Sequence, residues 1–205
     1  LVVAGRKGLT GFEPARGEPL WSWSPGASFV ESFTERDGLL GCVTRSDARA
    51  MLVVLDAHSG MELWARAIPV GLWSRPVVGS AHIVLLPNDY AASPATVLDP
   101  FTGSRSGFFA LPEHVGEPDI AGAWIEGERL ILPSFPKSSN AGERDCVSAW
   151  ELDTCKRAWH VWGDAGRSFD SIARCGERTY LVHLPSSVAL RGVSGMVQEL
   201  DTRIG

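Results

Sequence analysis

The chain has 205 residues, of which 44% are hydrophobic and 21% charged, and its formal net charge is −5. This composition is typical of a globular protein with a substantial core and excludes a disordered chain. The lysines and arginines are scattered, so there is no basic stripe of the kind that binds nucleic acid, and no apolar run approaches the roughly 20 residues of a membrane span.

Residues 1–23 predict part of a repeat and no nucleotide site. The stretch VVAGRKGLTG at 2–11 places Gly5, Gly8 and Gly11 after an apolar run, as a dinucleotide-binding loop would. That fingerprint requires a helix to follow, whereas Gly11 and Phe12 begin another strand pattern. No signal peptide is visible, and a cytoplasmic location is slightly favoured over a periplasmic one.

Residues 24–67 contain the clearest motif of the chain. VVLDAHSGMELW at 53–64 is an apolar run that stops at Asp56, turns at Gly60 and returns on Trp64. An Asp side chain can accept backbone N–H groups across such a turn, Gly can take the left-handed conformation, and Trp supplies a broad apolar surface. A metal site formed by Asp56 and His58 is the alternative interpretation.

The motif recurs along the whole chain, which favours a structural role over a metal site. A weaker copy has Glu13 and Trp21, and later copies begin at Asp99, Asp153 and Asp201, with Gly103 and Trp159 in the expected turn or return strand. The residues that correspond to His58 are Phe101, Cys155 and Arg203. The repeats span approximately 1–23, 24–67, 68–111, 112–162 and 163–205.

Two further residue types recur between the copies of the motif, a glycine and a proline. A glycine joins two short apolar runs in a predicted hairpin, at Gly38, Gly79, Gly127 and Gly176, where we expect positive φ. A proline that follows the second run, at Pro87, Pro133 and Pro185, is expected to end the strand. Four short strands per repeat, with almost no helical periodicity, are typical of a β-propeller blade.

The motif resembles the PQQ-like (quinoprotein-type) propeller repeat, whose pattern is Leu-Asp, two residues, Thr/Ser-Gly, three residues, Trp. The resemblance implies an all-β, WD40-like propeller of four-stranded antiparallel blades, with about five present, three complete and two partial. In such blades Asp caps the turn and Trp docks on the neighbouring blade. We expect the chain to be part of a longer propeller; a closed five-bladed ring is the alternative.

Catalytic chemistry finds little support in the sequence. Quinone-binding members of the resembled family have a vicinal Cys-Cys pair near the cofactor, and this chain has none; its four cysteines are expected to be thiols, with one disulfide as the alternative. Ser134 and Lys137 match an SxxK pattern by chance, since the SDN and KTG partners are missing. We therefore expect no catalytic, cofactor-binding or metal-binding residue.

The function expected is a non-catalytic scaffold that binds a protein partner or the remaining propeller blades, with no nucleic acid. Loops 87–95, 133–145 and 185–195 are the candidate contact surface, and Lys137, Asn140 and Arg144 are the candidate partner-binding residues. The alternatives are a fragment of a quinone-dependent enzyme and a periplasmic scaffold of the outer-membrane-assembly type.

Overall fold

The computed structural model describes residues 1–5, 7–47, 49–69, 73–87, 93–111, 117–118, 122–135, 146–162, 167–175, 178–185 and 196–200. Within these ranges every regular element is a β-strand, so the predicted all-β class is confirmed. In this part of the chain there is also no helix long and apolar enough to cross a membrane. The chain divides into two compact units, which are described separately: Leu1–Ala110 with Ile125–Glu128 (unit 1), and Leu111–Trp124 with Arg129–Gly205 (unit 2).

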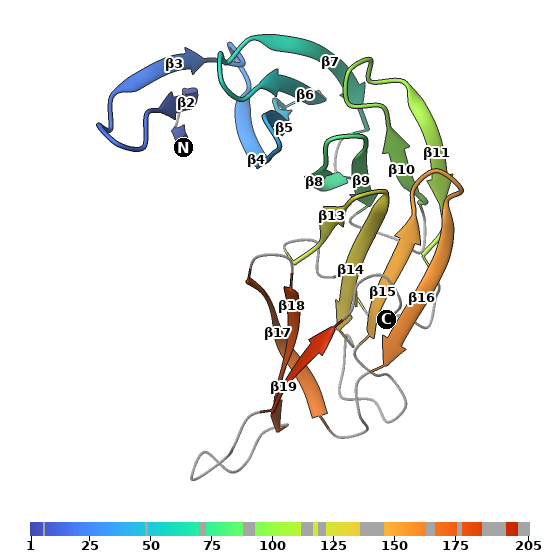
Figure 1. Ribbon diagram of the computed structural model, residues 1–205. Helices are drawn as coiled ribbons and strands as arrows, with labels where there is room; N and C mark the ends of the chain where they lie inside the picture. The colour runs from blue at the N-terminus through green and yellow to red at the C-terminus, as the bar shows by residue number, and fades with distance from the viewer. Residues whose placement is uncertain are drawn as a thin grey trace. The chain divides into compact units, whose positions relative to one another are not determined.

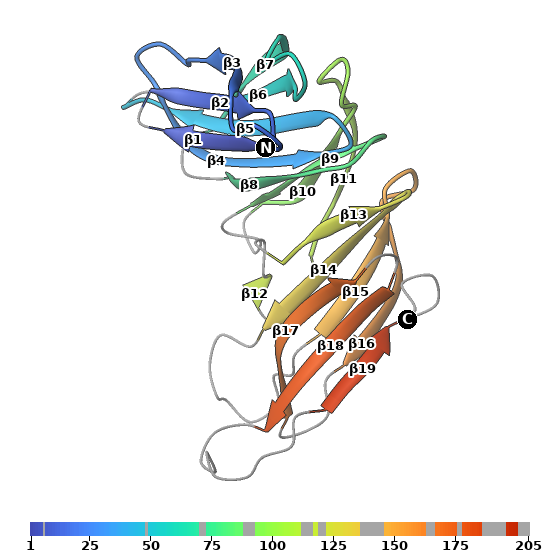
Figure 2. The same cartoon turned by 60° about the vertical axis from the view of Figure 1, so that its left-hand side comes forward.

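Unit 1 contains three antiparallel sheets, with strand orders β1-β2-β3, β4-β5-β6-β7 and β11-β10-β9-β8 (Figures 1 and 2). Each sheet is therefore a meander in which consecutive strands pair. The strands are β1 (Val2–Gly5), β2 (Gly8–Phe12), β3 (Pro19–Trp23), β4 (Phe29–Arg36), β5 (Leu39–Arg45), β6 (Ala50–Asp56), β7 (Glu62–Ile68), β8 (Trp73–Val78), β9 (Ile83–Pro87), β10 (Ala95–Leu98) and β11 (Arg105–Phe109).

The remaining strands form two sheets, with orders β12-β14-β15-β16 and β17-β18-β19, and β13 pairs with β14 as well. Their bounds are β12 (Glu117–Pro118), β13 (Trp124–Glu126), β14 (Arg129–Phe135), β15 (Cys146–Glu151), β16 (Lys156–Trp162), β17 (Arg167–Cys175), β18 (Arg178–Pro185) and β19 (Met196–Leu200). Among the described residues, two sheets therefore have four strands, one has five and two have three, which confirms the expected three complete and two partial blades.

The hairpin glycines follow the prediction at Gly38 and at Gly127 (φ 57°) and differ at Gly79, whereas Gly176 lies outside the described residues. Asp37 and Gly38 both have positive φ, 51° and 81°, and lie between the paired residues Arg36 and Leu39. This is the type I′ geometry that suits the twist of a two-residue hairpin. Gly79 is not among the positive-φ residues, because its hairpin has a longer loop closed by a 2.9 Å bond from Gly79 N to His82 O.

Gly79 is instead required by packing. A Cβ atom at this position would lie 2.7 Å from Cγ2 of Ile125. The expectation of positive φ at Gly79 is therefore wrong, and the sequence signal reflects a close approach of side chain to backbone.

The prolines show a second difference. Pro87 and Pro185 end β9 and β18, as expected, but Pro133 lies inside β14, opposite Val147 of β15, and the strand continues to Phe135. The N–H of a strand residue points to only one of its two neighbours, so a proline leaves the other ladder intact. The prediction that Pro133 ends its strand is wrong for this reason.

The core lies between and within the sheets of each unit. In unit 1 the middle strands are almost entirely buried: β5 and β9 consist of buried residues apart from Arg45. The outer strands β3, β7 and β11 consist of exposed and half-buried residues, apart from buried Ile68 and Phe109 at the ends of β7 and β11. The apolar runs therefore predict the middle strands, and the motif tryptophans lie on the outer ones.

Candidate functional site

The Asp56 turn is held by one carboxylate oxygen. Asp56 Oδ1 accepts the backbone N–H groups of His58 (3.0 Å) and Ser59 (2.7 Å) and the Ser59 hydroxyl (2.8 Å). The hydroxyl bond is the largest of these effects, and together they hold the pKa of the Asp56 carboxyl below 3.8. Asp56 and His58 are thus brought together by the backbone of the turn, with the carboxylate used as a cap.

Asp99 repeats this arrangement. Its Oδ1 accepts the backbone N–H groups of Phe101 (2.9 Å) and Thr102 (2.7 Å) and the Thr102 hydroxyl (2.9 Å). The Thr102 N–H is the main cause that lowers the pKa of Asp99. The same hydroxyl position, Ser59 in one turn and Thr102 in the next, therefore serves the cap.

The turn backbone is the same with or without the aspartate. In the Asp56 turn the N–H of Asp56 donates to Met61 O (2.9 Å) and that of Gly60 to Asp56 O (2.8 Å). The Glu13 turn has the corresponding bonds, from Glu13 N to Glu18 O (2.9 Å) and from Gly17 N to Glu13 O (2.8 Å). Hydrogen bonding of the main chain and a glycine define the turn, and Asp reinforces it.

Each motif tryptophan of unit 1 docks on the turn of the next sheet. The indole N–H of Trp21, on β3, donates to Ala57 O at 3.0 Å, and that of Trp64, on β7, donates to Pro100 O at 2.7 Å. A Cβ atom on Gly60 would lie 2.5 Å from the Trp21 ring, and one on Gly103 would lie 2.8 Å from the Trp64 ring. The tryptophan of one repeat thus packs on the Asp-Gly turn of the next repeat, and this contact occurs at both interfaces between neighbouring sheets of unit 1.

The register of the outer strands identifies the tryptophan position in the other sheets. Trp64 pairs with Val54, and in the fourth sheet Trp159 pairs in the same way with Ala149. Trp159 packs in a cluster with Trp124, Ile131, Val147, Ala149 and Val161. In β11 the position is Gly107, opposite Val97, and the adjacent Phe108 is exposed.

The strand register also shows which acidic residue of the fourth repeat corresponds to Asp56, and it is not the predicted Asp153. Glu151, eight residues before Trp159, takes the ladder position of Asp56, whereas Asp153 lies within a tight turn over 152–155. Cys155 takes the left-handed conformation there, with φ 55°. Glu151 accepts a bond from Arg129 Nη2 at 2.7 Å. The spacing of eight residues between acid and tryptophan, shared by Glu13 and Trp21, is the signal that finds Glu151.

The predicted partner-binding residues Lys137, Asn140 and Arg144 lie outside the described residues, as does Asp201. Most of loops 87–95, 133–145 and 185–195 lies outside them too. The prediction that these loops bind a partner therefore stays a prediction.

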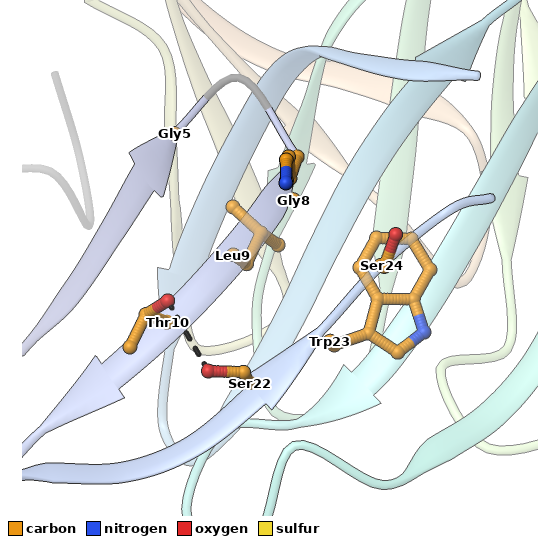
Figure 3. Close-up of a pocket in the computed structure, with 8 residues that line it drawn as sticks. Gly5, Gly8, Leu9, Thr10, Ser22, Trp23 and Ser24 are labelled. Atoms are coloured by element: carbon orange, nitrogen blue, oxygen red, sulfur yellow. Dashed lines mark hydrogen bonds between the residues drawn. The ribbon is translucent and has the colours of Figure 1, made fainter. Parts of the chain in front are cut away.

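One pocket of unit 1 lies at the hairpin of β1 and β2 (Figure 3). Its volume is about 380 Å³, and the hydroxyls of Thr10 and Ser22 lie 3.4 Å apart on its wall. Trp23 also lines it, with its indole N–H directed to Glu62 Oε2 at 3.4 Å. Lys7 supplies the only ionisable side chain among the described lining residues, so the pocket offers polar contacts without an acid–base pair.

A second hollow, of about 460 Å³, lies between Ala4 of β1, residues 30–35 of β4, and Arg75 of β8. Arg75 Nε donates to Thr34 Oγ1 at 2.8 Å. Near this wall Glu31 and Arg45 form an ion pair at 2.9 Å. This hollow lies beside Ala4 of β1.

His82, Cys42, Cys146 and Cys155 show no sign of catalytic activation. His82 is buried, and its Nε2 lies 2.7 Å from Glu128 Oε2. Cys42, Cys146 and Cys155 are free thiols. Burial raises the pKa of Cys42 to about 12 and that of Cys146 to about 11, so neither thiol is activated.

No family model and no curated protein matches the chain. Solved structures match at low identity: BamB from Moraxella catarrhalis (14% identity, TM-score 0.59, 90% of this chain and 54% of that one) and the Pan2 WD40 domain of Neurospora crassa (12%, 0.56, 88% and 55%). A europium-containing methanol dehydrogenase also matches (14%, 0.51, 90% and 45%). The chain spans about half the length of these structures, which show that its fold is of the β-propeller type.

Proposed function

We propose that the chain is a non-catalytic propeller scaffold of the PQQ-like repeat type and that it binds another protein. The Asp-x-x-Ser/Thr-Gly turns and the tryptophans that dock on them support the repeat assignment, since both appear in consecutive sheets. These side chains are engaged in joining blades. The interaction surface is therefore formed by other residues.

The observation that carries the proposal is the exposure of large apolar side chains on the outer strands of unit 1. Leu20 on β3, Met61 before β7, and Phe108 on β11 are 62%, 61% and 59% exposed, and Phe101 in the Asp99 turn is 64% exposed. Single exposed apolar residues are ordinary. Their recurrence at the outer strand, or at the turn leading to it, in three consecutive sheets is typical of an interaction surface.

The test combines Met61→Ser, Phe101→Ser and Phe108→Ser in one variant. We expect its denaturation midpoint to remain close to that of the unaltered chain and its capture of protein from a native extract, measured by quantitative mass spectrometry, to fall at least about tenfold. A Leu1→Ser variant, which alters an exposed residue off the outer strands, is the control. Equal capture by all three proteins contradicts the proposal.

A fragment of a quinone-dependent enzyme is the second candidate, favoured by the similarity to the methanol dehydrogenase structure. Titration of the chain with pyrroloquinoline quinone and calcium, followed by absorbance, separates the two. Stoichiometric binding contradicts the scaffold proposal and supports the enzyme.

A further inference from the structure

An arginine of β7 lies at the interface between the sheet of β4–β7 and the sheet of β8–β11 (Figure 1). Arg66 lies two residues after Trp64, so both side chains take the same face of the strand. This face is directed to the next sheet, because Trp64 donates to Pro100 O and Arg66 Nη1 donates to Gly103 O at 2.9 Å. The Arg66 guanidinium therefore lies at the turn from which β11 begins.

Arg105 and Phe108 of β11 form the other side of this interface. Gly107 holds the ladder position of Trp64, so the adjacent Phe108 takes the opposite face of β11, which is directed back to β7. The guanidinium carbon of Arg105 lies over the Phe108 ring, 5.8 Å from its centre, and this ring is 59% exposed. Arg66, Arg105 and Phe108 thus share one surface within unit 1.

The preceding interface of unit 1, between the sheet of β1–β3 and that of β4–β7, has a donor and an acceptor at the same positions. Trp23 of β3 corresponds to Arg66, since each lies two residues after the motif tryptophan. Glu62 of β7 corresponds to Arg105, since each is opposite the leucine that precedes the cap aspartate. The Trp23 indole N–H is directed to Glu62 Oε2 at 3.4 Å. There the donor on one outer strand meets a carboxylate on the next.

Between β7 and β11 a second cation replaces this carboxylate. Neither Arg66 nor Arg105 forms an ion pair with a carboxylate of the described residues, whereas Arg45 and Arg129 are each paired with a glutamate. The carboxylate of Asp99, in the same turn, is used as the cap, where its Oδ1 accepts three bonds. Two guanidinium groups therefore face this surface without the acceptor that the preceding interface provides.

Phe108 adds an exposed apolar ring beside these charges. Its counterpart at the preceding interface is Ala65, so the ring is also a departure from the repeat. Aromatic residues and arginine are enriched at protein–protein interfaces, and arginine can bind a carboxylate through two parallel hydrogen bonds. Both sides of the interface are four-stranded sheets, so this surface is not an edge left by an absent strand.

We propose that this surface binds an acidic segment of a partner protein, whose carboxylates accept bonds from Arg66 and Arg105 and whose adjacent apolar side chain packs on Phe108. This inference rests on the proposed scaffold function and specifies the chemistry of one partner. The formal net charge of the chain is −5. An acidic segment is therefore repelled by the chain as a whole and attracted at this surface, which fixes where it binds.

The probe is a phage-displayed library of random dodecapeptides, selected on the immobilised 205-residue chain. We expect the selected peptides to be enriched in Asp and Glu beside aromatic or aliphatic residues. One selected peptide is synthesised with a fluorophore, and a second copy carries Asn and Gln in place of Asp and Glu. Fluorescence anisotropy is expected to show a Kd at least about tenfold higher for the amide peptide. Binding of the acidic peptide should weaken as salt is raised, because salt screens exposed charges.

A variant of the chain tests the contact itself. Arg105→Glu restores the carboxylate that Glu62 supplies at the preceding interface, so its urea midpoint is expected to be no lower than that of the unaltered chain. The same variant is expected to bind the acidic peptide at least about tenfold more weakly. Arg49→Glu makes the same change of charge at an exposed residue outside this surface and is the control, with a change in Kd below about twofold. Loss of binding without loss of stability separates contact from misfolding.

Selection of no peptide overturns the inference, as does a selected set without an excess of acidic residues. Equal binding of the acidic peptide by Arg105→Glu and the unaltered chain overturns it too, because the peptide then binds elsewhere. The scaffold proposal is judged separately, by capture from the extract. Capture that the triple serine variant loses and Arg105→Glu retains supports the scaffold and contradicts the acidic partner.

Discussion

The turn glycines separate two physical requirements that usually occur together. Gly17, Gly60 and Gly103 have φ of 67°, 70° and 67°, so each needs the left-handed conformation. A Cβ on Gly17 would meet nothing within 4 Å, whereas one on Gly60 would lie 2.5 Å from the Trp21 ring. The backbone requirement is shared by all three, and the packing requirement applies only where a tryptophan docks.

Gly17→Ala is therefore expected to reduce the free energy of unfolding by about 1–2 kcal/mol, the cost of left-handed backbone for an L-residue. Gly60→Ala is expected to reduce the free energy of unfolding by the same backbone amount and by a further amount of about 1–3 kcal/mol, because the added methyl group overpacks against Trp21. Urea denaturation measures both. An equal reduction in the free energy of unfolding in the two variants would show that the Trp21 indole moves away from the added methyl group without loss of stability.

The buried thiols give a prediction on reactivity. Raised pKa values, about 12 for Cys42 and about 11 for Cys146, keep both groups protonated at ordinary pH. At about pH 8 we expect iodoacetamide to modify half-buried Cys155 in the native chain, and Cys42 and Cys146 only after unfolding. Peptide mass mapping follows each thiol separately. Native modification of Cys42 as fast as in urea would be incompatible with its burial.

The same thiols make the folded chain sensitive to alkali. The pKa of each is higher in the folded chain than its ordinary value of 9.0, so ionisation favours the unfolded state. Their contribution to stability is present below about pH 9 and is lost as the pH rises toward the folded values.

At the scale of the strand, the docked indole joins one sheet to the next. Trp64→Ala is expected to reduce the free energy of unfolding by about 3 kcal/mol, because it removes apolar contact and the bond to Pro100 O. Trp64→Phe keeps part of the ring contact and loses the bond, so about 1–2 kcal/mol is expected. Hydrogen exchange at the Asp99 turn should accelerate in both variants. Trp162→Ala, at a 39% exposed residue, is the control and should cost below about 0.5 kcal/mol.

Sequence patterns predict these elements because strand, turn and docking residues recur with one spacing. The Asp56 repeat could be interpreted alone, since its cap, glycine and tryptophan are all present. The fourth repeat could not, because Asp153 looks like a better cap than Glu151. Only the ladder, which places Ala149 opposite Trp159 as Val54 lies opposite Trp64, shows that Glu151 holds the position of Asp56. A glycine such as Gly79 can be required by a positive φ or by close packing, here against Ile125, and the local sequence does not distinguish the two.

On the scale of the whole molecule, function was less predictable than fold. The fold depends on contacts that every repeat makes, so each copy adds to the signal. A residue that differs between sheets adds no such signal: only the ladder shows that Ser32 holds the place in β4 that Arg75 holds in β8. Repetition therefore predicts what the sheets share, and the structure is needed to find where one of them differs.

The repeated aspartate caps give the molecule a characteristic response to acid. Asp56 and Asp99 have pKa values lowered from 3.8 by the bonds their carboxylates accept. Their contribution to stability is present above the unfolded value and is lost as the pH falls through the lower folded values.

An Asp56→Asn, Asp99→Asn double variant keeps an acceptor oxygen at each cap but not its charge. We expect it to be less stable than the unaltered chain at about pH 7, and the difference in urea midpoint to shrink as the pH falls below 3.8 and the caps protonate. Asp47→Asn, at an exposed loop residue, should show no such convergence. A difference that stays constant across this range would mean that geometry alone, without the charge, accounts for the caps.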